Sequence, residues 1–218
     1  DILVTPIVTI VAGGTVGVVL GPPLAEGMSA LGHFINTVTT LHPFIMGILI
    51  SVIMGMILTL PISSAALSII IGLSGIAGGA ATVGCCCQMI GFAVASFREN
   101  KFQGLLAQGL GTSMLQVPNI VRHPKIWIPP TVAAAILGPV STMVFKMVNN
   151  PSGSGMGTSG LVGQFMTWQE MAGSMPPALL LGEIALMHFI LPAALTLLIS
   201  TAMRKLGWIH DGDMKLEL

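Results

Sequence analysis

The run from Thr82 to Phe97 reads TVGCCCQMIGFAVASF, with no charged residue and several of the smallest side chains. It approaches the length of about 20 residues that a helix needs to cross the hydrocarbon core of a bilayer. Glycine, alanine and other small residues let helix backbones come close together, and close packing is what holds helices to one another in lipid. This run therefore predicts a membrane helix that packs tightly against its neighbours.

The three cysteines of the chain are the consecutive residues Cys85, Cys86 and Cys87 inside this run. Consecutive cysteines suit neither a zinc site nor a disulfide framework. We expect them to be small residues packed between helices. We expect no cofactor and no metal, because the chain has too few carboxylates for an oxygen-ligated ion.

The whole chain has the same apolar character. Of its 218 residues, 53% are hydrophobic and 7% are charged, with a mean hydropathy of +0.91, whereas soluble domains carry about 25% charged residues. The net charge is zero, so nothing indicates a nucleic-acid partner. Long apolar runs with short polar interruptions predict an all-α, polytopic integral membrane bundle whose surroundings are the lipid bilayer.

Several further runs are long and apolar enough to be expected crossings. They are Ile2–Leu20, Phe44–Leu60, Ser64–Gly78, Ile126–Val148 and Pro176–Met203. Residues 98–125 and 149–175 lie between such runs. The first segment is too polar for a helix that faces lipid. The second begins with a stretch rich in glycine and serine, Asn149–Gly160, for which a flexible external linker is the alternative. We interpret the two segments as two candidate re-entrant hairpins, and residues 1–218 as a single transmembrane domain.

The basic residues predict the orientation of the chain. Six of the eight fall in three short clusters, Arg98/Lys101, Arg122/Lys125 and Arg204/Lys205. Positively charged segments favour the cytoplasmic side, which places residues 204–218 there as a cytoplasmic tail. Segment 98–125 must then enter and leave from the cytoplasm, and segment 149–175 from outside. Broken helices that approach each other in this way form midplane sites in secondary transporters.

Two ionisable residues of the last run, Glu183 and His188, are candidate site residues because such groups are costly to keep in hydrocarbon. Hydrogen bonding inside the bundle is the alternative for both. The polar side chains of the two hairpin candidates suit a neutral ligand that bears hydroxyl or amide groups. These candidates are Thr112, Ser113, Gln116, Asn150, Ser152, Ser154, Thr158, Ser159 and Gln164.

Two stretches carry a resemblance to a known family: NIVRHPKIWIPPTVAAAILGPVSTMVF (Asn119–Phe145) and NNPSGSGMGTSGLVGQFMTWQEM (Asn149–Met171). In this order, followed by a last run that begins with proline, they resemble the membrane-embedded IIC subunits of the bacterial sugar phosphotransferase system. The likeness is greatest to the IIC-like perfringolysin O regulator proteins. It implies a multi-pass protein of the bacterial inner membrane that forms a homodimer. It implies phospho-carrier proteins as further partners. It also implies that this chain is the C-terminal, substrate-site part of a longer protein.

The chain departs from its sugar-transporting relatives at the residues that carry phosphotransfer. Those relatives have an acidic residue in the first hairpin, where this chain has Leu110–Ser113, and a histidine after the helix that here ends at Leu60. The matching positions offer Ser63 and Ser64 instead. A carboxylate and a histidine would accept the proton of a sugar hydroxyl during phosphorylation. The resemblance therefore predicts that the chain binds and translocates a sugar-like solute. At the matching positions the chain has no residue that could act as the base in a coupled phosphorylation.

Two functions remain open at this stage. The first is transport of a small polar, sugar-like solute by alternating access, with the two hairpins as gates. The second is a non-transporting membrane sensor or regulator that keeps the IIC fold. A channel is disfavoured, because the sequence has neither a ring of charges nor a filter-like repeat.

Overall fold

The computed structural model describes residues 33–217, together with Val8, Ile10, Gly14, Glu26, Gly27 and Ala30. The crossing expected over Ile2–Leu20 lies outside the described residues, apart from three isolated positions. Most of the described part of the protein is helical and it contains no β-strand, which confirms the all-α membrane bundle. A single isolated bridge joins Gly75 to Asn149.

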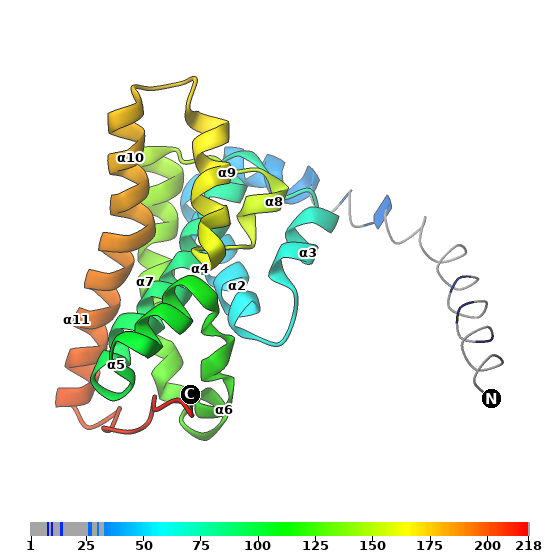
Figure 1. Ribbon diagram of the computed structural model, residues 1–218. Helices are drawn as coiled ribbons and strands as arrows, with labels where there is room; N and C mark the ends of the chain where they lie inside the picture. Colours follow the sequence, from blue (N-terminus) through cyan, green and yellow to red (C-terminus); the bar gives the residue numbers. More distant parts are fainter. Residues whose placement is uncertain are drawn as a thin grey trace.

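Four long helical stretches form the bundle (Figure 1). Three are long and apolar enough to cross a membrane: α4 (Gly75–Ala95), Pro124–Phe145 and Pro177–Lys205. Pro124–Phe145 consists of η3 (Pro124–Trp127), α7 (Ile128–Pro139) and η4 (Val140–Phe145), and Pro177–Lys205 of α10 (Pro177–Ala185), η6 (Leu186–Ile190) and α11 (Leu191–Lys205). The fourth, α2 (Pro43–Thr59), is shorter, with 17 residues. All four lie at expected crossings.

The separate crossing expected over Ser64–Gly78 is wrong. Helix α3 covers only Ser64–Ile70, and its seven residues span about 10 Å, far less than the hydrocarbon core. Gly72 and Gly75 both adopt positive φ, 62° and 60°, which few other residues tolerate, and they turn the chain where α4 begins. The apolar run is thus divided between a short surface helix and the start of the next crossing.

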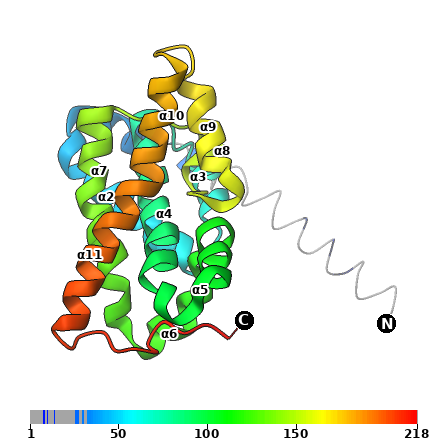
Figure 2. The same ribbon diagram turned by 60° about the vertical axis from the view of Figure 1, so that its left-hand side comes forward.

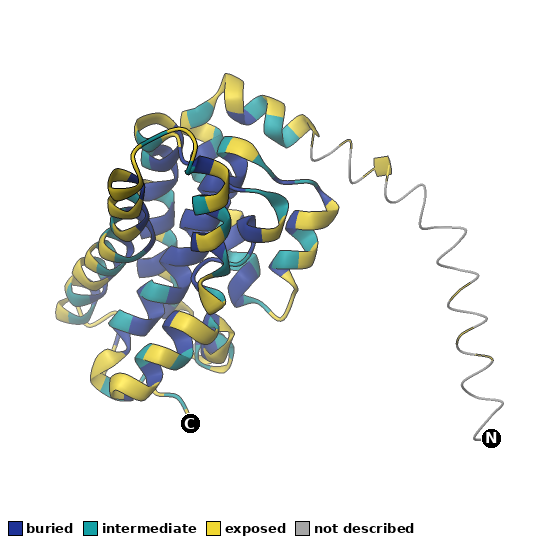
Figure 3. Cartoon of the chain, turned by 45° about the horizontal axis from the view of Figure 1, so that its top comes forward, coloured by how far each residue is buried: buried dark blue, intermediate teal, exposed yellow. Residues whose placement is uncertain are grey.

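Helix α4 is the centre of the bundle. Of its apolar stretch, 89% is buried, and α2, α7 and α11 pack around it (Figures 2 and 3). Small side chains let the neighbouring helices come close to an enclosed helix, and the three cysteines are free and fully buried there. A Cβ atom at Gly84 would collide with the backbone of Ser51 on α2. The small residues of α4 therefore set how closely its neighbours approach.

Two π-helical turns accompany the prolines inside the long helices. η4 follows Pro139 directly, and η6 ends two residues before Pro192. In η6, the N–H of Leu191 donates to the carbonyl of Leu186, five residues back. Because proline removes an N–H donor from the helix, this wider turn re-pairs the backbone nearby.

Two segments fold back toward the middle of the bundle from opposite ends (Figure 1). Segment 98–125 contains most of α5 (Phe97–Leu106), then η1 (Ala107–Gly111), η2 (Ser113–Gln116) and α6 (Val117–Arg122). Segment 149–175 contains α8 (Pro151–Ser154), η5 (Ser159–Leu161) and α9 (Val162–Met171). Each starts and ends at one end of the bundle, and the two meet between η1 and η5.

The C-terminal tail, residues 206–217, runs beneath segment 98–125 and is fastened to it. The side chain of Asn100 donates to the carbonyl of Met214 (2.8 Å) and accepts from the N–H of Leu216 (2.8 Å). Gln116 donates to the same Met214 carbonyl (3.0 Å), and Asn119 to the carbonyl of Lys215 (2.9 Å). The Met214 side chain is fully buried, so the tail is part of the packed structure.

Replacing Asn100 with alanine should release this tail. The change removes two hydrogen bonds at a site that is 9% exposed, and we expect the stability of the tail contact to fall by about 2 kcal/mol. Limited trypsin digestion should then cut faster at Lys205 and Lys215. Asn119→Ala, which removes an exposed contact to the tail, is the matched control and should change the rate less. Equal protection of Asn100→Ala and the unaltered protein would contradict the assigned role.

Candidate functional site

Three parts of the chain that are distant in sequence line a partly open cavity of about 170 Å³. The turn before α3 forms one wall, the bend between η1 and η2 forms the second, and the stretch between α8 and η5 forms the third. The lining residues are Leu58, Ile62, Ser63, Ser64, Ala65, Met89, Gly111, Thr112, Met114, Gly155, Met156 and Ser159. The volume equals that of about six water molecules, so the cavity suits a small ligand.

Four hydroxyl groups face this cavity, and most of their hydrogen-bonding capacity is uncommitted. Ser63 accepts from the N–H of Ala66, and Thr112 accepts from the N–H of Met114, so each keeps its own hydrogen for donation. Ser64 donates to the carbonyl of Gly155 (2.6 Å) and keeps its oxygen lone pairs. With Ser159, these groups offer both donors and acceptors to a neutral polar ligand.

Direct hydrogen bonds hold the walls of the cavity together. The hydroxyl of Thr158 donates to the carbonyl of Gly109 (2.6 Å), which joins the two segments that fold back. The Ser64 to Gly155 bond joins the turn before α3 to the same region. Thr158 is fully buried, and its bond to Gly109 uses a carbonyl in a π-helical turn. Such turns are frequent at functional sites.

A buried polar network lies behind the bend between η1 and η2. Ser113 and Thr59 are joined through their hydroxyl oxygens at 2.9 Å, and Thr59 also donates to Gln88 Oε1 (3.3 Å). The indole N–H of Trp127 donates to the same Gln88 oxygen (3.0 Å), and Gln88 Nε2 donates to the Thr131 hydroxyl (3.1 Å). The network connects α2, α4 and α7 to the cavity wall. Ser113 is therefore a supporting residue one layer behind the cavity.

Asn149 fastens segment 149–175 to α4. Its side-chain amide is 1% exposed and donates to the Thr82 hydroxyl (2.6 Å), the Gly163 carbonyl (3.1 Å) and the Thr167 hydroxyl (3.1 Å). Its oxygen accepts from the N–H of Asn150 (2.8 Å). Asn150 is among the site residues predicted from the sequence, and Asn149 is not. No sequence pattern separates two adjacent asparagines, of which only the first is buried.

Asn149→Ala should loosen this segment and weaken whatever binds beside it. The change removes the buried amide donor from the Thr82 and Thr167 hydroxyl oxygens, which still donate to the Gly78 and Gly163 carbonyls, and we expect the free energy of unfolding to fall by about 2 kcal/mol. Thermal denaturation of the purified protein in detergent measures the effect. Asn150→Ala is the matched control. Asn150 caps α8 at a less buried position, so removing its side chain should lower the free energy of unfolding by about 1 kcal/mol. A larger loss for Asn150→Ala than for Asn149→Ala would refute this ranking.

The other candidates from the sequence lie outside the cavity. Ser154 donates to the carbonyls of Leu73 and Asn150, and Gln116 bonds to Gln108 and the tail. Ser152 is exposed. Gln164 Nε2 lies 3.1 Å from His188 Nδ1 in the interior, and Glu183 is half-buried on α10. The structure thus brings Ser63, Ser64, Thr112 and Ser159 together at the cavity.

A second cavity, of about 440 Å³, lies on the other side of the same bend. Thr112 and Met114 line both cavities, so the bend forms the wall between them. The second cavity is also bordered by Arg122 of α6 and by Lys215 of the tail. A path from the inner cavity to this end of the molecule would therefore pass the bend of segment 98–125.

Comparison with protein families matches residues 1–216 to the family described as "Phosphotransferase system, EIIC". This match covers nearly the entire chain. The chain belongs to the phosphotransferase system EIIC family. No curated protein and no solved structure matches it in the corresponding searches. The EIIC protein is accordingly a membrane protein of phosphotransferase-type transport.

The inner cavity of this EIIC protein has the hydroxyl character expected from the sequence. None of the described residues that line it is a carboxylate or a histidine. Glu183 and His188 lie on the last long helix, and neither contributes to the lining. The arrangement can bind a neutral polar molecule, but the lining supplies no general base.

Proposed function

We propose that this EIIC protein carries a small polar, sugar-like solute across the bacterial inner membrane by alternating access. In this proposal, segments 98–125 and 149–175 are re-entrant hairpins that close on the solute. The supporting observation is the cavity between Gly111–Met114 and Gly155–Ser159, where the two segments meet. Family membership supports transport in general.

The chemistry of the lining supports a hydroxylated solute. Sugar hydroxyl groups both donate and accept hydrogen bonds, and the serine and threonine hydroxyls of the cavity can do both in return. The remaining lining is apolar, with Leu58, Met89 and Met156 among its members. A mixture of apolar wall and few polar groups is typical of sites for small ligands.

The proposal includes gating at the contact between the hairpins. The Thr158 to Gly109 hydrogen bond closes the site between segments that enter from opposite ends. In this proposal, breaking that hydrogen bond is one step in the movement of segment 98–125 relative to segment 149–175. Non-helical backbone at membrane depth is tolerated only where it is buried in protein or lines a cavity, and the η1–η2 bend lines the cavity.

We further propose that translocation by this chain does not depend on phosphorylation of the solute. The cavity has no carboxylate and no histidine within the described lining, so no base is at hand to accept a hydroxyl proton. The end with the tail would face the cytoplasm, since positively charged segments favour that side. The resemblance to IIC subunits supports a homodimer.

Uptake into proteoliposomes tests the function. The full chain is reconstituted, and the entry of labelled monosaccharides and disaccharides is measured with and without phosphorylated carrier proteins. We expect saturable uptake of at least one sugar, recovered unmodified in both conditions. Recovery of a sugar phosphate would overturn the proposal that translocation does not depend on phosphorylation of the solute. Sugar binding without any uptake would instead support a sensor that has kept the fold.

A further inference from the structure

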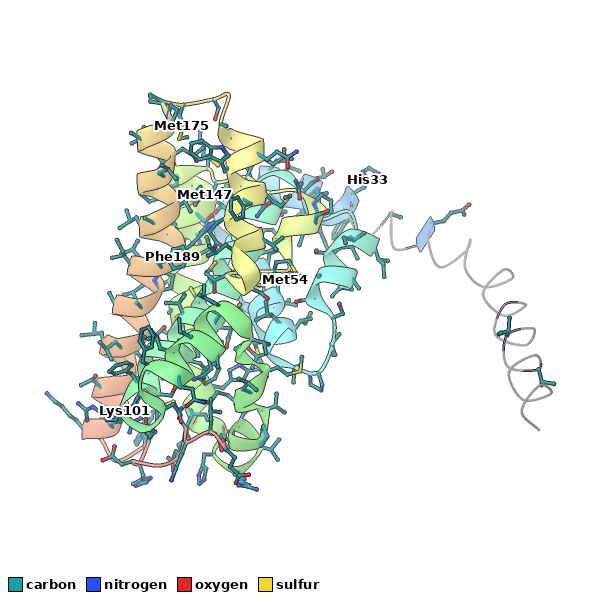
Figure 4. All side chains as sticks on the ribbon, in the orientation of Figure 1. His33, Met54, Lys101, Met147, Met175 and Phe189 are labelled. Carbon is teal, nitrogen blue, oxygen red and sulfur yellow. The ribbon has the colours of Figure 1, made fainter. Side chains whose placement is uncertain are left out.

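Basic residues gather at the end of the bundle that carries the C-terminal tail. Glu99 and Arg204 pair at 2.6 Å, and Lys125 Nζ lies 6.0 Å from the centre of the Trp208 ring, so α5, the start of η3 and the tail meet there. Seven of the eight lysines and arginines of the chain belong to this end: Arg98, Lys101, Arg122, Lys125, Arg204, Lys205 and Lys215. Figure 4 places Lys101 at this end and Met175 at the opposite one.

A cavity of about 380 Å³ opens at this end, between the start of α5, the last turns of α11 and the tail. Its lining contains four residues that carry or can carry positive charge and a single acidic one. The lining residues are Arg98, Thr201, Arg204, Lys205, Ile209, His210 and Asp211. The cavity is separate from the one proposed for the solute, with which it shares no lining residue.

The positive charges of this cavity are of two kinds. Arg204 is neutralised, since it contacts Glu99 at 2.6 Å and Asp211 at 2.7 Å and is mostly buried. Arg98 and Lys205 are exposed and form no ion pair within the described part of the chain. The cavity therefore has a fixed arginine that shapes it and two cations that remain available to an anion.

An apolar track leads along α11 to these cations. Leu197, Thr201 and Lys205 follow one another at intervals of four residues, so they share one face of the helix. Leu197 is 50% exposed and its neighbour Leu198 is 68% exposed, as expected for side chains that face acyl chains. Trp208, 50% exposed just beyond the helix, is typical of the level where lipid headgroups lie.

We propose that this cavity binds the phosphate-bearing headgroup of an anionic phospholipid, with the acyl chains along the Leu197–Leu198 face of α11. Arg98 and Lys205 would contact the phosphate, and the Thr201 hydroxyl would donate to it. A free phosphate ion could use the same two cations, but it would leave the adjoining apolar face unused. Basic pockets beside membrane helices are known to hold acidic lipid headgroups.

The test measures lipid binding by the full chain, delipidated in detergent, by native mass spectrometry. Phosphatidylglycerol is titrated against phosphatidylcholine, and inorganic phosphate is added in a separate arm. We expect phosphatidylglycerol to bind more tightly than phosphatidylcholine. The double variant Arg98→Gln/Lys205→Gln should weaken phosphatidylglycerol binding about thirtyfold, as expected for two lost contacts of this kind.

A second double variant, Arg122→Gln/Lys215→Gln, is the matched control. It removes the same charge from the same end of the molecule, but its residues border the other cavity. We expect it to change phosphatidylglycerol binding less than about threefold. Both pairs are exposed, and circular dichroism verifies that each variant is folded.

Three results would overturn the proposal. Equal weakening of phosphatidylglycerol binding by both double variants would show that the lipid responds to the overall charge of this end and not to the proposed pocket. Equal binding of phosphatidylglycerol and phosphatidylcholine would show that the headgroup charge is not recognised. Displacement of the lipid by inorganic phosphate at similar concentration would assign the site to a free anion.

Discussion

Gly84→Ala should prevent the bundle from packing and lower the free energy of unfolding by about 3 kcal/mol or more. A Cβ atom at this position would overlap the carbonyl oxygen of Ser51 and lie 2.6 Å from its Cα. Both atoms belong to the backbone of α2, so no side chain can rotate away. The Ser51 hydroxyl also donates to the Ala134 carbonyl on α7 (2.8 Å), and α2 cannot retreat without breaking that bond.

Gly182→Ala is the matched control for this change. Gly182 lies in α10, where an added Cβ would meet no atom within 4 Å. The free energy of unfolding of Gly182→Ala should stay within about 1 kcal/mol of that of the unaltered protein, since alanine favours the helix slightly more than glycine. Thermal denaturation and size-exclusion profiles in the same detergent compare the two variants. If Gly84→Ala behaves like Gly182→Ala, then α2 and α4 are not in the close contact described above.

The close contact between Gly84 and the backbone of Ser51 depends on small side chains, and small side chains are visible in the sequence. For this reason the membrane bundle could be predicted from the sequence. Segments without charge, of suitable length and rich in small residues leave few alternatives to closely packed membrane helices. The structure therefore confirms the helices around Thr82–Phe97 and Ile126–Val148. It divides Ser64–Gly78, because two glycines with positive φ interrupt a run whose hydropathy is continuous.

The candidate site could be predicted only in part. Ser63, Ser64, Thr112 and Ser159 do line one cavity, although they lie in three separate parts of the sequence. What a sequence does not contain is the direction in which each polar side chain points. Gln88 and Asn149 join helices through buried amide groups, yet nothing in their sequence neighbours distinguishes them from exposed amides.

Gly111→Phe should strongly reduce solute uptake while the protein stays folded. Gly111 lines the inner cavity, and a Cβ at this position would meet no atom within 4 Å, so the first atom of the new side chain requires no movement of the backbone. A benzyl group would occupy much of a cavity of about 170 Å³. We expect the initial rate of sugar uptake into proteoliposomes to fall at least about tenfold, which corresponds to about 1.4 kcal/mol of lost binding.

Gly173→Phe separates filling of the cavity from the general effect of an added aromatic group. Gly173 also has no atom within 4 Å of an added Cβ, but it lies in the turn that joins α9 to α10, away from the cavity lining. Uptake by Gly173→Phe should match that of the unaltered protein, and both variants should denature at similar temperatures. Normal uptake by Gly111→Phe would exclude the inner cavity from the solute path. Loss of uptake in both variants would trace the effect to the added bulk. Only loss confined to Gly111→Phe places the solute between the two segments, because the substituted side chain lies at their junction.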